Sequence, residues 1–547
     1  MTLGAAMLLL ALAIAACGSS SNSSSSSQEV GTKSENVKAT SGKPAELAES
    51  TWVVPEEWDA IDPTRIAATN ESAILLVLEP LILPNPEGGA ALPNLAHLER
   101  PDPSTYVFNI RKGVKFTDGN PLTVEDVIYS LNLHLEKGST SNLASLRETV
   151  KSLKQTGPDQ ITITLKKPDL TFEDKIAQAG IVEKSVREKL GDHPGAPGSP
   201  NVGTGPYTVE TFKPGNELVL QRNESYWGKK PALKTIKLRL IEDESSELLA
   251  ARSGELTGAF ETPPSQANVY EEVPGMHLIS GYNPSVVMFN MDTTKAPWND
   301  IHVRRAIALS IDREGLVQSI VKGKGEVAPS VVQQSNAEEV LSKPEATKLY
   351  EEFSETNTFD LKKAEEEMAK SKTPDGFTET VIYDQSQPDT GKVAQVLAQE
   401  VKPLGINLKV KEVPDSQYLN AVFFEHTMTS AIVDFTTDIL DPISLPNYLT
   451  NSVNLKENGG YTDIANWSSP EMDKILNTYL EGNSQTEKPR QAKLLTEALK
   501  IMNEEETYVP IYHADYLALV KDGLTFNDFN GFWWEYRWPE LIREEAE

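Results

Sequence analysis

Side chains capable of acid–base, nucleophilic or metal chemistry are scattered along the chain and form no catalytic pattern. Two histidines four residues apart would place two metal ligands on one helix face. None of the seven histidines has that spacing; they stand at 97, 134, 193, 277, 302, 426 and 513. Ser319 and Lys322 fit Ser-x-x-Lys, but the companion elements of penicillin-recognising enzymes are absent. We interpret Glu504–Glu506 as a solvated helix end, and we expect no catalytic residues and no enzyme activity.

Glycine-rich stretches and cysteines also fail to indicate a cofactor site. No Gly-x-x-x-x-Gly-Lys-[Ser/Thr] loop occurs, so the chain is not expected to hydrolyse ATP itself. Gly203-Thr-Gly205 is followed at once by Pro206 instead of a helix, which argues against a phosphate cradle. Cys17 is the single cysteine, and a thiolate metal site is therefore not expected either. The sequence predicts no cofactor and no bound metal.

Cys17 follows an uncharged apolar run and small residues. The run covers 1–16, which is shorter than the roughly 20 residues that span a bilayer and suits a secretory signal. The ending Ile14-Ala15-Ala16-Cys17-Gly18 resembles the lipobox of bacterial lipoproteins, in which the thiol is acylated. The alternative is an ordinary signal peptide with an incidental cysteine. The sequence departs from the usual pattern in one respect, because no Lys or Arg precedes the run.

A serine-rich segment follows the cysteine. Residues 17–45 are small and polar and cannot bury enough apolar surface to order, so they predict a tether. About 28 such residues span roughly 30 Å root-mean-square. With lipid on Cys17, the expected location is the extracytoplasmic face of the cell membrane. In an envelope without an outer membrane, only the lipid would keep the protein there.

The remaining length and charge limit the architecture and the partners. About 500 residues remain, which suits two large lobes or three smaller domains. The formal net charge of −29 argues against nucleic acid and against anionic lipid as partners, since both need a basic surface.

Strand-like and helical patterns alternate along the body, which is typical of α/β proteins. We expect strands at 51–54, 106–110, 160–165, 217–220, 286–290, 378–383, 406–410, 508–512 and 517–520. We expect helices at 70–78, after a cap at Thr123, at 301–311 and at 391–401. The segment 378–410 is predicted to be a βαβ unit, and the last two strands to return to the first half. The Gly- and Pro-rich stretch 191–200 predicts a surface loop.

Five ordered blocks over about 300 residues carry a family resemblance. The blocks are Pro93–Ala96 with Thr105–Gly119 and Pro121–Ser130; Val202–Tyr207; Asn223–Trp227; Asn290 through Val303–Ala306 to Ile311–Arg313; and Leu404–Ile406. They resemble the signature of extracellular solute-binding family 5, the oligopeptide-, dipeptide- and nickel-binding proteins of ABC importers. Their residues are mainly structural. Asp118-Gly119 predicts a turn, and Gly203 and Gly205 predict close packing of the backbone. Arg304 and Asp312 are expected to form ion pairs that hold the scaffold together.

The resemblance implies an α/β fold of two lobes, of the class II-like, three-subdomain periplasmic-binding-protein type, with a hinge and a ligand cleft between the lobes. The implied division is a first lobe at 46–281 with an extra subdomain at about 70–200, a second lobe at 282–512, and a return to the first lobe at 513–547. The implied partners are a membrane permease and its ATPase, and the chain is expected to act as a monomer.

The resemblance also suggests ligand contacts. Phe435-Thr436-Thr437-Asp438 before Asp441-Pro442 matches a family stretch whose first Asp receives a peptide's α-ammonium group, so Asp438 is the implied contact, with Phe435 and Thr436 beside it. An alternative is that Asp438 caps a helix or turn, as expected for Asp441. Glu57-Trp58-Asp59 match the strand that offers backbone to the ligand. Tyr512 and His513 are expected to line the cleft.

The ligand itself stays open at this point. The family's arginine for a peptide carboxylate has no match, since Ile432 stands in that neighbourhood. Short peptides are the leading prediction. An oligosaccharide stacked on Trp58, Trp467 or Trp533, or a metal chelate, is the alternative. An enzyme lacks its motifs, and an adhesin would be expected to show repeats, which the chain does not have.

Overall fold

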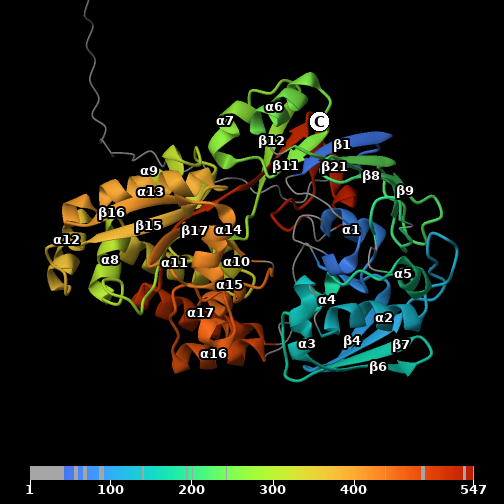
Figure 1. Cartoon of the computed structure of the whole chain (residues 1–547), viewed down its shortest axis with the longest axis horizontal. Coiled ribbons are helices and arrows are strands. Elements are labelled where there is room, and N and C mark those ends of the chain that lie inside the picture. The colour runs from blue at the N-terminus through green and yellow to red at the C-terminus, as the bar shows by residue number, and fades with distance from the viewer. Residues whose placement is uncertain are drawn as a thin grey trace, which may run out of the picture. The chain divides into compact units, whose positions relative to one another are not determined.

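A computed structural model describes the chain (Figure 1). The described residues are 42–54, 60–65, 71–85, 91–137, 139, 141–191, 195–199, 201–241, 243–437, 439–481, 487–533 and 537–545. Cys17 and the predicted tether up to residue 41 lie outside these ranges. The prediction of a tether is wrong for its last residues, because Pro44 pairs with Arg543 and Ala45 is 1% exposed.

The larger sheet, called the first sheet below, has seven strands drawn from both ends of the chain. Its order is β12 (Met276–Gly281), β19 (Tyr516–Lys521), β11 (Gly258–Phe260), β1 (Glu49–Val54), β10 (Thr235–Leu240), β9 (Glu217–Arg222) and β8 (Tyr207–Lys213). β1 pairs in parallel with β10 and β11, and the other neighbours are antiparallel. Helices α6 (Glu244–Ser253) and α7 (Ala267–Tyr270) lie near β11 and β12 (Figure 1).

Aromatic residues from distant segments form the core of the first sheet. Trp52 on β1 stacks on Phe260 of β11 with ring centroids 5.0 Å apart, and Trp533 stacks on the same Phe260. Trp538 contacts all three rings edge-on. The C-terminal segment, with β20 (Leu524–Phe526) paired to β21 (Ile542–Glu544), is thereby fixed to this sheet. Trp533 is 1% exposed, so it is a core residue and not a stacking platform for a sugar.

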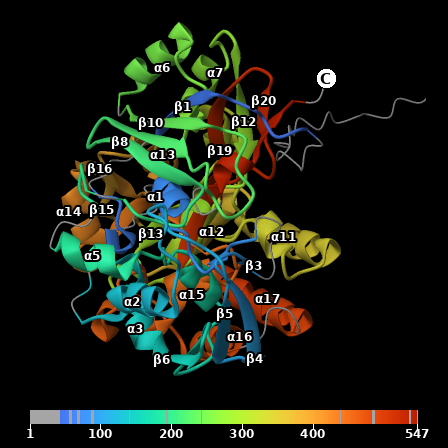
Figure 2. The same ribbon diagram turned by 90° about the vertical axis from the view of Figure 1, so that its right-hand side faces the viewer.

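A four-stranded antiparallel sheet, the small sheet, follows β1 in the chain. Its order is β4 (Ala96–Asp102), β5 (Thr105–Ile110), β7 (Gln160–Leu165) and β6 (Val150–Gly157). Figure 2 shows α2 (Val124–Leu135) and α3 (Leu146–Thr149) beside it. The neighbouring elements are α1 (Glu71–Val77), β2 (Ile82–Leu83), β3 (Leu92–Pro93), α4 (Phe172–Ala177) and α5 (Lys184–Leu190). The expected cap at Thr123 is confirmed, because its hydroxyl and the Asp126 carboxylate form a capping box.

The second sheet has six strands in the order β14 (Gly325–Val327), β18 (Tyr508–Ala514), β13 (Ser285–Met291), β17 (Ser430–Thr436), β15 (Thr378–Asp384) and β16 (Asn407–Val413). Both of its faces are covered. Val286 and Met288 belong to one hydrophobic cluster, and Val287 and Phe289 to another, as the alternation of side chains along a strand requires. This is why β13 is apolar throughout.

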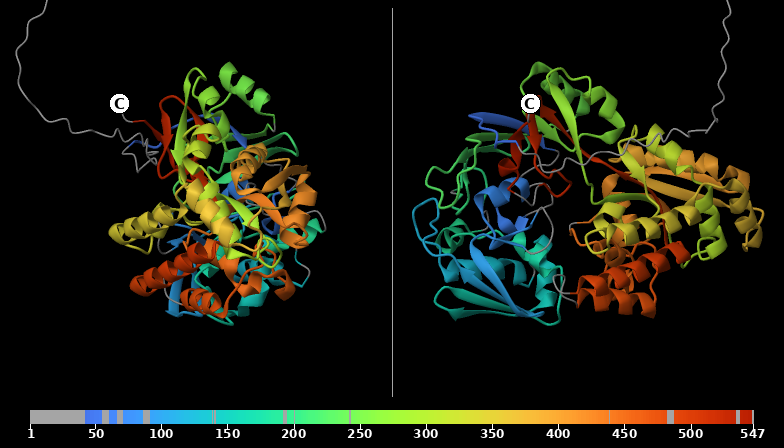
Figure 3. Two further views of the ribbon diagram at one scale, coloured as in Figure 1. Left: turned by 90° about the vertical axis from the view of Figure 1, so that its left-hand side faces the viewer. Right: turned by 180° about the vertical axis from the view of Figure 1, so that it is seen from behind.

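Two sets of helices cover these faces. One set is α8 (Ile301–Ser310), α9 (Arg313–Ser319), α12 (Leu361–Lys370) and α13 (Pro388–Glu400). The other is α10 (Gln334–Ala337), α11 (Lys343–Asn357), α14 (Asp415–Leu419), α15 (Ser444–Thr450), α16 (Pro470–Leu480) and α17 (Lys488–Glu505). Figure 3 shows α16 and α17, in red, packed side by side. Within the described ranges, no helix is both long and apolar enough to cross a membrane.

Most predicted elements are confirmed, including the βαβ unit, in which β15 and β16 pair in parallel around α13. The predicted strand at 508–512 exists as β18, but it lies in the second sheet; of the last two predicted strands only β19 joins the first sheet. The predicted helix at 70–78 is observed as Glu71–Val77.

The interpretation of Glu504–Glu506 as a solvated helix end is wrong for Glu506. This side chain is 5% exposed, and burial raises the pKa of its carboxyl to about 8. The positive charges of Arg313, Arg305 and Arg304 oppose this rise. The expected ion pairs of Arg304 and Asp312 are largely replaced by backbone contacts. Arg304 donates to the carbonyl oxygens of Glu505 and Glu506, and Asp312 caps α9 by accepting from the Gly315 amide at 2.9 Å.

Gly203 and Gly205 allow the backbone packing that the sequence predicts. A Cβ at Gly203 would lie 1.9 Å from the carbonyl oxygen of Val77, and one at Gly205 would lie 2.2 Å from that of Leu76. Both contacts are with the last turn of α1. The expected turn at Asp118-Gly119 is also present, with Gly119 at φ +95°.

Gly203→Ala is expected to lower the free energy of unfolding by about 3 kcal/mol, because the new methyl group meets rigid backbone. Urea unfolding followed by tryptophan fluorescence measures the change. Gly157→Ala is the control, since its nearest neighbour is the Gln160 side chain at 3.2 Å on an exposed strand end. Equal effects of the two substitutions would contradict the packing argument.

Candidate functional site

The chain passes between the first and second sheets at two adjacent places. β12 ends at Gly281 and β13 begins at Ser285, while β18 ends at Ala514 and β19 begins at Tyr516. The Ser280 hydroxyl donates to Asp515 Oδ2 at 2.9 Å, and the Asp515 amide donates to the Lys324 carbonyl at 3.1 Å. These bonds join the two connections to each other and to the second sheet.

The predicted contact residues fall into two groups. Asp438, and Glu57, Trp58 and Asp59, lie outside the described residues. Phe435, Thr436, Tyr512 and His513 are described and lie at the ends of β17 and β18, the strands that flank β13 on either side.

Within the second group, Thr436 is exposed and opposite Ser285, whereas Phe435 is 6% and Tyr512 1% exposed. Phe435 packs in the core on one face of the second sheet and Tyr512 on the other. They position the strands and present little surface to a solute.

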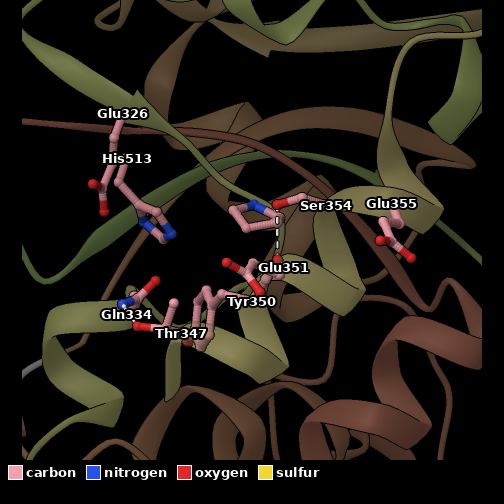
Figure 4. Close-up of a pocket in the computed structure, with 9 residues that line it drawn as sticks. Glu326, Gln334, Thr347, Tyr350, Glu351, Ser354, Glu355 and His513 are labelled. Carbon is pink, nitrogen blue, oxygen red and sulfur yellow. Dashed lines mark hydrogen bonds between the residues drawn. The ribbon is translucent and has the colours of Figure 1, made fainter. Parts of the chain in front are cut away.

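His513 connects three segments beside the chain connections. Its Nδ1 lies 2.9 Å from the Ser285 carbonyl and its Nε2 lies 3.1 Å from the Ser330 carbonyl. Burial lowers the pKa of the imidazole, while Glu326 and the two carbonyls oppose that effect. Figure 4 shows His513 and Glu326 at a cavity of about 400 Å³ that α11 lines with Glu351 and Glu355. The ring is therefore a structural link at the edge of an acidic cavity.

The neighbours of position 438 are held in place by hydrogen bonds. The Thr437 amide donates to the Pro284 carbonyl at 3.1 Å, in the first chain connection. The Thr437 hydroxyl donates to the Ser444 hydroxyl at 3.0 Å and accepts from the Ile439 amide at 3.2 Å. The segment that carries the predicted contact is thus attached both to the connection and to α15.

Asp441 forms the turn that the sequence predicts for it. Its Oδ1 accepts from the Ile443 amide at 3.0 Å and from the Tyr479 hydroxyl at 2.8 Å. Burial raises the pKa of the Asp441 carboxyl, and these two hydrogen bonds oppose that rise. The Asn336 side-chain amide donates a hydrogen bond to the carbonyl oxygen of Leu440, the residue before Asp441, at 2.7 Å.

A cavity of about 410 Å³, which we call the α4–α15 cavity, has Ile439 among its lining residues. One wall belongs to α4 and the loops of the small sheet, and the other to α15 and α16. It is lined by 148, 149, 166–169, 171, 175, 439, 444, 447, 448, 477, 480 and 481. The Leu170 amide donates to the Leu480 carbonyl at 3.2 Å across its rim.

The lining of the α4–α15 cavity is polar and carries charges of both signs. Lys166, Lys167 and Lys175 face the same space as Asn447 and Asn477. Such a lining suits a polar or charged solute held by several hydrogen bonds. No local pattern identifies these residues, because the two walls are more than 250 positions apart in the chain.

Among the described residues, no group of three or more His, Cys, Asp or Glu side chains is arranged to hold a metal ion. Trp467, offered above as a sugar platform, packs against the core of the second sheet and is partly buried.

Comparisons with known proteins agree with this architecture. A family model described as "Bacterial extracellular solute-binding proteins, family 5 Middle" matches residues 46–457. The oligopeptide-binding protein OppA of Bacillus subtilis is 24% identical over 442 residues, covering 75% of this chain and 77% of that protein. The structure of DppA from Helicobacter pylori, in complex with the peptide STSA, has a TM-score of 0.73 at 19% identity and covers 91% of this chain and 98% of that one.

A second solved structure, NikZ from Campylobacter jejuni in complex with Ni(L-His), has a TM-score of 0.72 at 19% identity, covering 91% of this chain and 99% of that one. The chain belongs to the bacterial extracellular solute-binding proteins of family 5. It is a substrate-binding protein of ABC importers and not an enzyme.

Tyr479→Phe is expected to lower the free energy of unfolding by about 1 kcal/mol, because Asp441 loses a buried hydrogen-bond donor. Since Asp441 anchors the turn after position 438, the affinity for the bound solute is expected to fall as well. Urea unfolding and titration calorimetry measure the two effects.

Tyr461→Phe is the matched control, since Tyr461 is 54% exposed. A Tyr479→Phe protein that loses stability but keeps its affinity would show that this turn does not position the ligand contact.

Proposed function

We propose that this chain captures short peptides between its two lobes and that Asp438 pairs with the peptide's α-ammonium group. The observation that carries the proposal is the setting of position 438. Its neighbours are bonded to the chain connection at Pro284 and to α15, and the α4–α15 cavity begins at Ile439. An ammonium group leaving water needs a charged partner, and the carboxylate of Asp438 would supply one.

The lobes in this proposal follow the sheets. The first lobe is 46–281 with 515–547, including the extra subdomain at about 70–200, and the second lobe is 282–514. Sheet membership supports the boundary after 281, because β12 ends in the first sheet at Gly281 and β13 begins in the second sheet at Ser285. It moves the second boundary from 512 to 514, because His513 and Ala514 pair with β14 in the second sheet. The hydrogen bond between the Leu170 amide and the Leu480 carbonyl already joins the walls of the α4–α15 cavity, so an opening movement about the two connections would separate them. The protein acts as a monomer in this scheme and passes its ligand to a permease and its ATPase.

The relatives support peptide as the ligand class without deciding it. The B. subtilis relative is named for oligopeptides, and the H. pylori structure holds the peptide STSA. The C. jejuni structure holds Ni(L-His), so a metal chelate is the second candidate. Native mass spectrometry of protein purified from its own host separates a peptide, a metal adduct and a glycan by mass.

Asp438→Asn is expected to weaken peptide binding at least about tenfold, or about 1.4 kcal/mol, because the ammonium group loses its charged partner. Titration calorimetry with a short peptide measures the affinity, and the same peptide with an acetylated N-terminus should bind as weakly to the unaltered protein.

Asp375→Asn is the control, being an exposed carboxylate elsewhere in the second lobe. An Asp438→Asn protein that is folded and keeps its affinity overturns the assignment of this residue.

We also propose that lipid on Cys17 anchors the protein to the extracytoplasmic face of the membrane. In the expressing bacterium, Cys17→Ala should move the protein from the membrane fraction to the medium or periplasm, because a thiol is needed for acylation. Mass spectrometry of the N-terminal peptide should find acyl chains on Cys17 in the unaltered protein. An unmodified Cys17 in a membrane-bound protein would contradict the anchor.

A further inference from the structure

A second large cavity, which we call the basic cavity, lies against the first sheet, away from the chain connections. Its volume is about 710 Å³. The walls come from the segment before β1, the β9–β10 loop and the C-terminal strand β21. It is lined by Pro44, Glu46, Leu47, Ala48, Arg222, Lys229, Lys230, Pro231, Ala232, Lys234, Pro539, Glu540 and Arg543.

The charge of the basic cavity is opposite to that of the chain. Five of its lining residues are basic and two are acidic, whereas the whole chain has 51 basic and 80 acidic residues. In solution the Debye length is about 8 Å, so charges elsewhere on the protein cancel little of this local excess.

Part of the positive charge has no carboxylate partner. Arg222 and Lys230 share Glu224, at 2.8 and 3.1 Å. Among the described residues, no carboxylate lies within 4.0 Å of the ammonium groups of Lys229 and Lys234.

The remaining groups of the wall leave that excess in place. Arg543 donates to the carbonyl oxygens of Glu540 and Ile542. The Glu540 carboxylate lies 3.7 Å from Arg537 and also attracts Lys229 and Arg543. Glu46 is the other carboxylate of the lining, so two lining carboxylates face five cations.

A phosphate group matches this arrangement better than a single carboxylate does. It carries up to two negative charges and several acceptor oxygens, which several donors can share. Lysine ammonium groups bind phosphate as point charges, and an arginine adds a planar pair of donors.

The position of the basic cavity relative to the N-terminal segment indicates the source of the phosphate. The Glu544 amide donates to the Lys43 carbonyl at 2.8 Å, and the Ala45 amide donates to the Ile542 carbonyl at 3.2 Å. The first described residues are therefore bonded to the strand that forms the cavity wall.

Gly42 is 25 positions after Cys17. With the random-coil dimensions predicted for its serine-rich sequence, such a segment spans about 28 Å. A lipid on Cys17 would hold the cavity within that range of the bilayer and raise the effective concentration of head groups there.

We propose that the basic cavity is a phosphate-recognition site and that the anchor presents it to the head groups of anionic phospholipids. The choice of phospholipid as the source rests on the proposed anchor, while the phosphate chemistry does not. The net charge of −29 argued against anionic lipid as a partner, but it describes the whole chain and not this wall.

The test uses the full chain with Cys17→Ala, so that no acyl chain contributes to binding. Co-sedimentation is measured with vesicles of phosphatidylcholine alone and with vesicles that also contain phosphatidylglycerol. Binding of inorganic phosphate and of glycerol 1-phosphate is measured by titration calorimetry. Each measurement is repeated with Lys229→Gln/Lys234→Gln, and with Lys409→Gln/Lys411→Gln on β16 as an equally charged, exposed control.

The expected result is binding to the phosphatidylglycerol vesicles that weakens about tenfold in Lys229→Gln/Lys234→Gln and is unchanged in the control pair. Peptide affinity should be equal in all three proteins, which separates this test from the test of peptide capture.

Binding of the soluble phosphates without vesicle binding would retain the phosphate site and overturn the phospholipid source. Equal losses in both double variants, or no binding of either kind, would overturn the site.

Discussion

The two short connections between the sheets are the constraint on which the site depends. The first sheet takes its strands from both ends of the chain and the second sheet takes β18 from near the C-terminus, so the chain must cross between them and cross back. The crossings lie together because Ser280 and Asp515 share a hydrogen bond and because His513 reaches the Ser285 carbonyl. Any movement of one lobe against the other must be accommodated by the few residues between these anchors.

The same constraint explains where a ligand contact can act. β17 ends next to the first connection, and Thr437 is bonded to Pro284 within it. Ile439, two residues further on, lines the α4–α15 cavity, whose opposite wall is formed by α4 and the loops of the small sheet. A ligand bound in that cavity would contact both walls, so its binding energy could favour a closed arrangement. A contact deep in either sheet, such as Tyr512, could not do this.

The sequence allowed prediction of elements whose pattern is local. The alternation in 378–383 and 406–410 around an amphipathic helix yields the unit β15–α13–β16, and Thr123 with Asp126 forms a cap within one turn. Pairing between distant segments was beyond local patterns, as with β1 and β10, which are about 185 positions apart. The pKa of Glu506 also depends on arginines of α8 and α9, almost 200 positions or more away in the chain. For the site, family resemblance supplied Asp438, whereas the lysines of the α4–α15 cavity carry no recognisable motif.

Net charge is informative about a surface only when the charges are spread evenly, and here they are not. The chain is strongly acidic, and three of its glutamates line the cavity beside His513. The basic cavity beside the first described residues nevertheless has mostly basic charged residues in its lining. An acidic surface is repelled by an anionic bilayer, while a basic wall is drawn to it. Under the proposed anchor on Cys17, both effects would act in the same direction, because both would turn the basic cavity toward the membrane and the acidic surfaces away from it. An unequal distribution of charge can thus orient a tethered receptor without a second anchor.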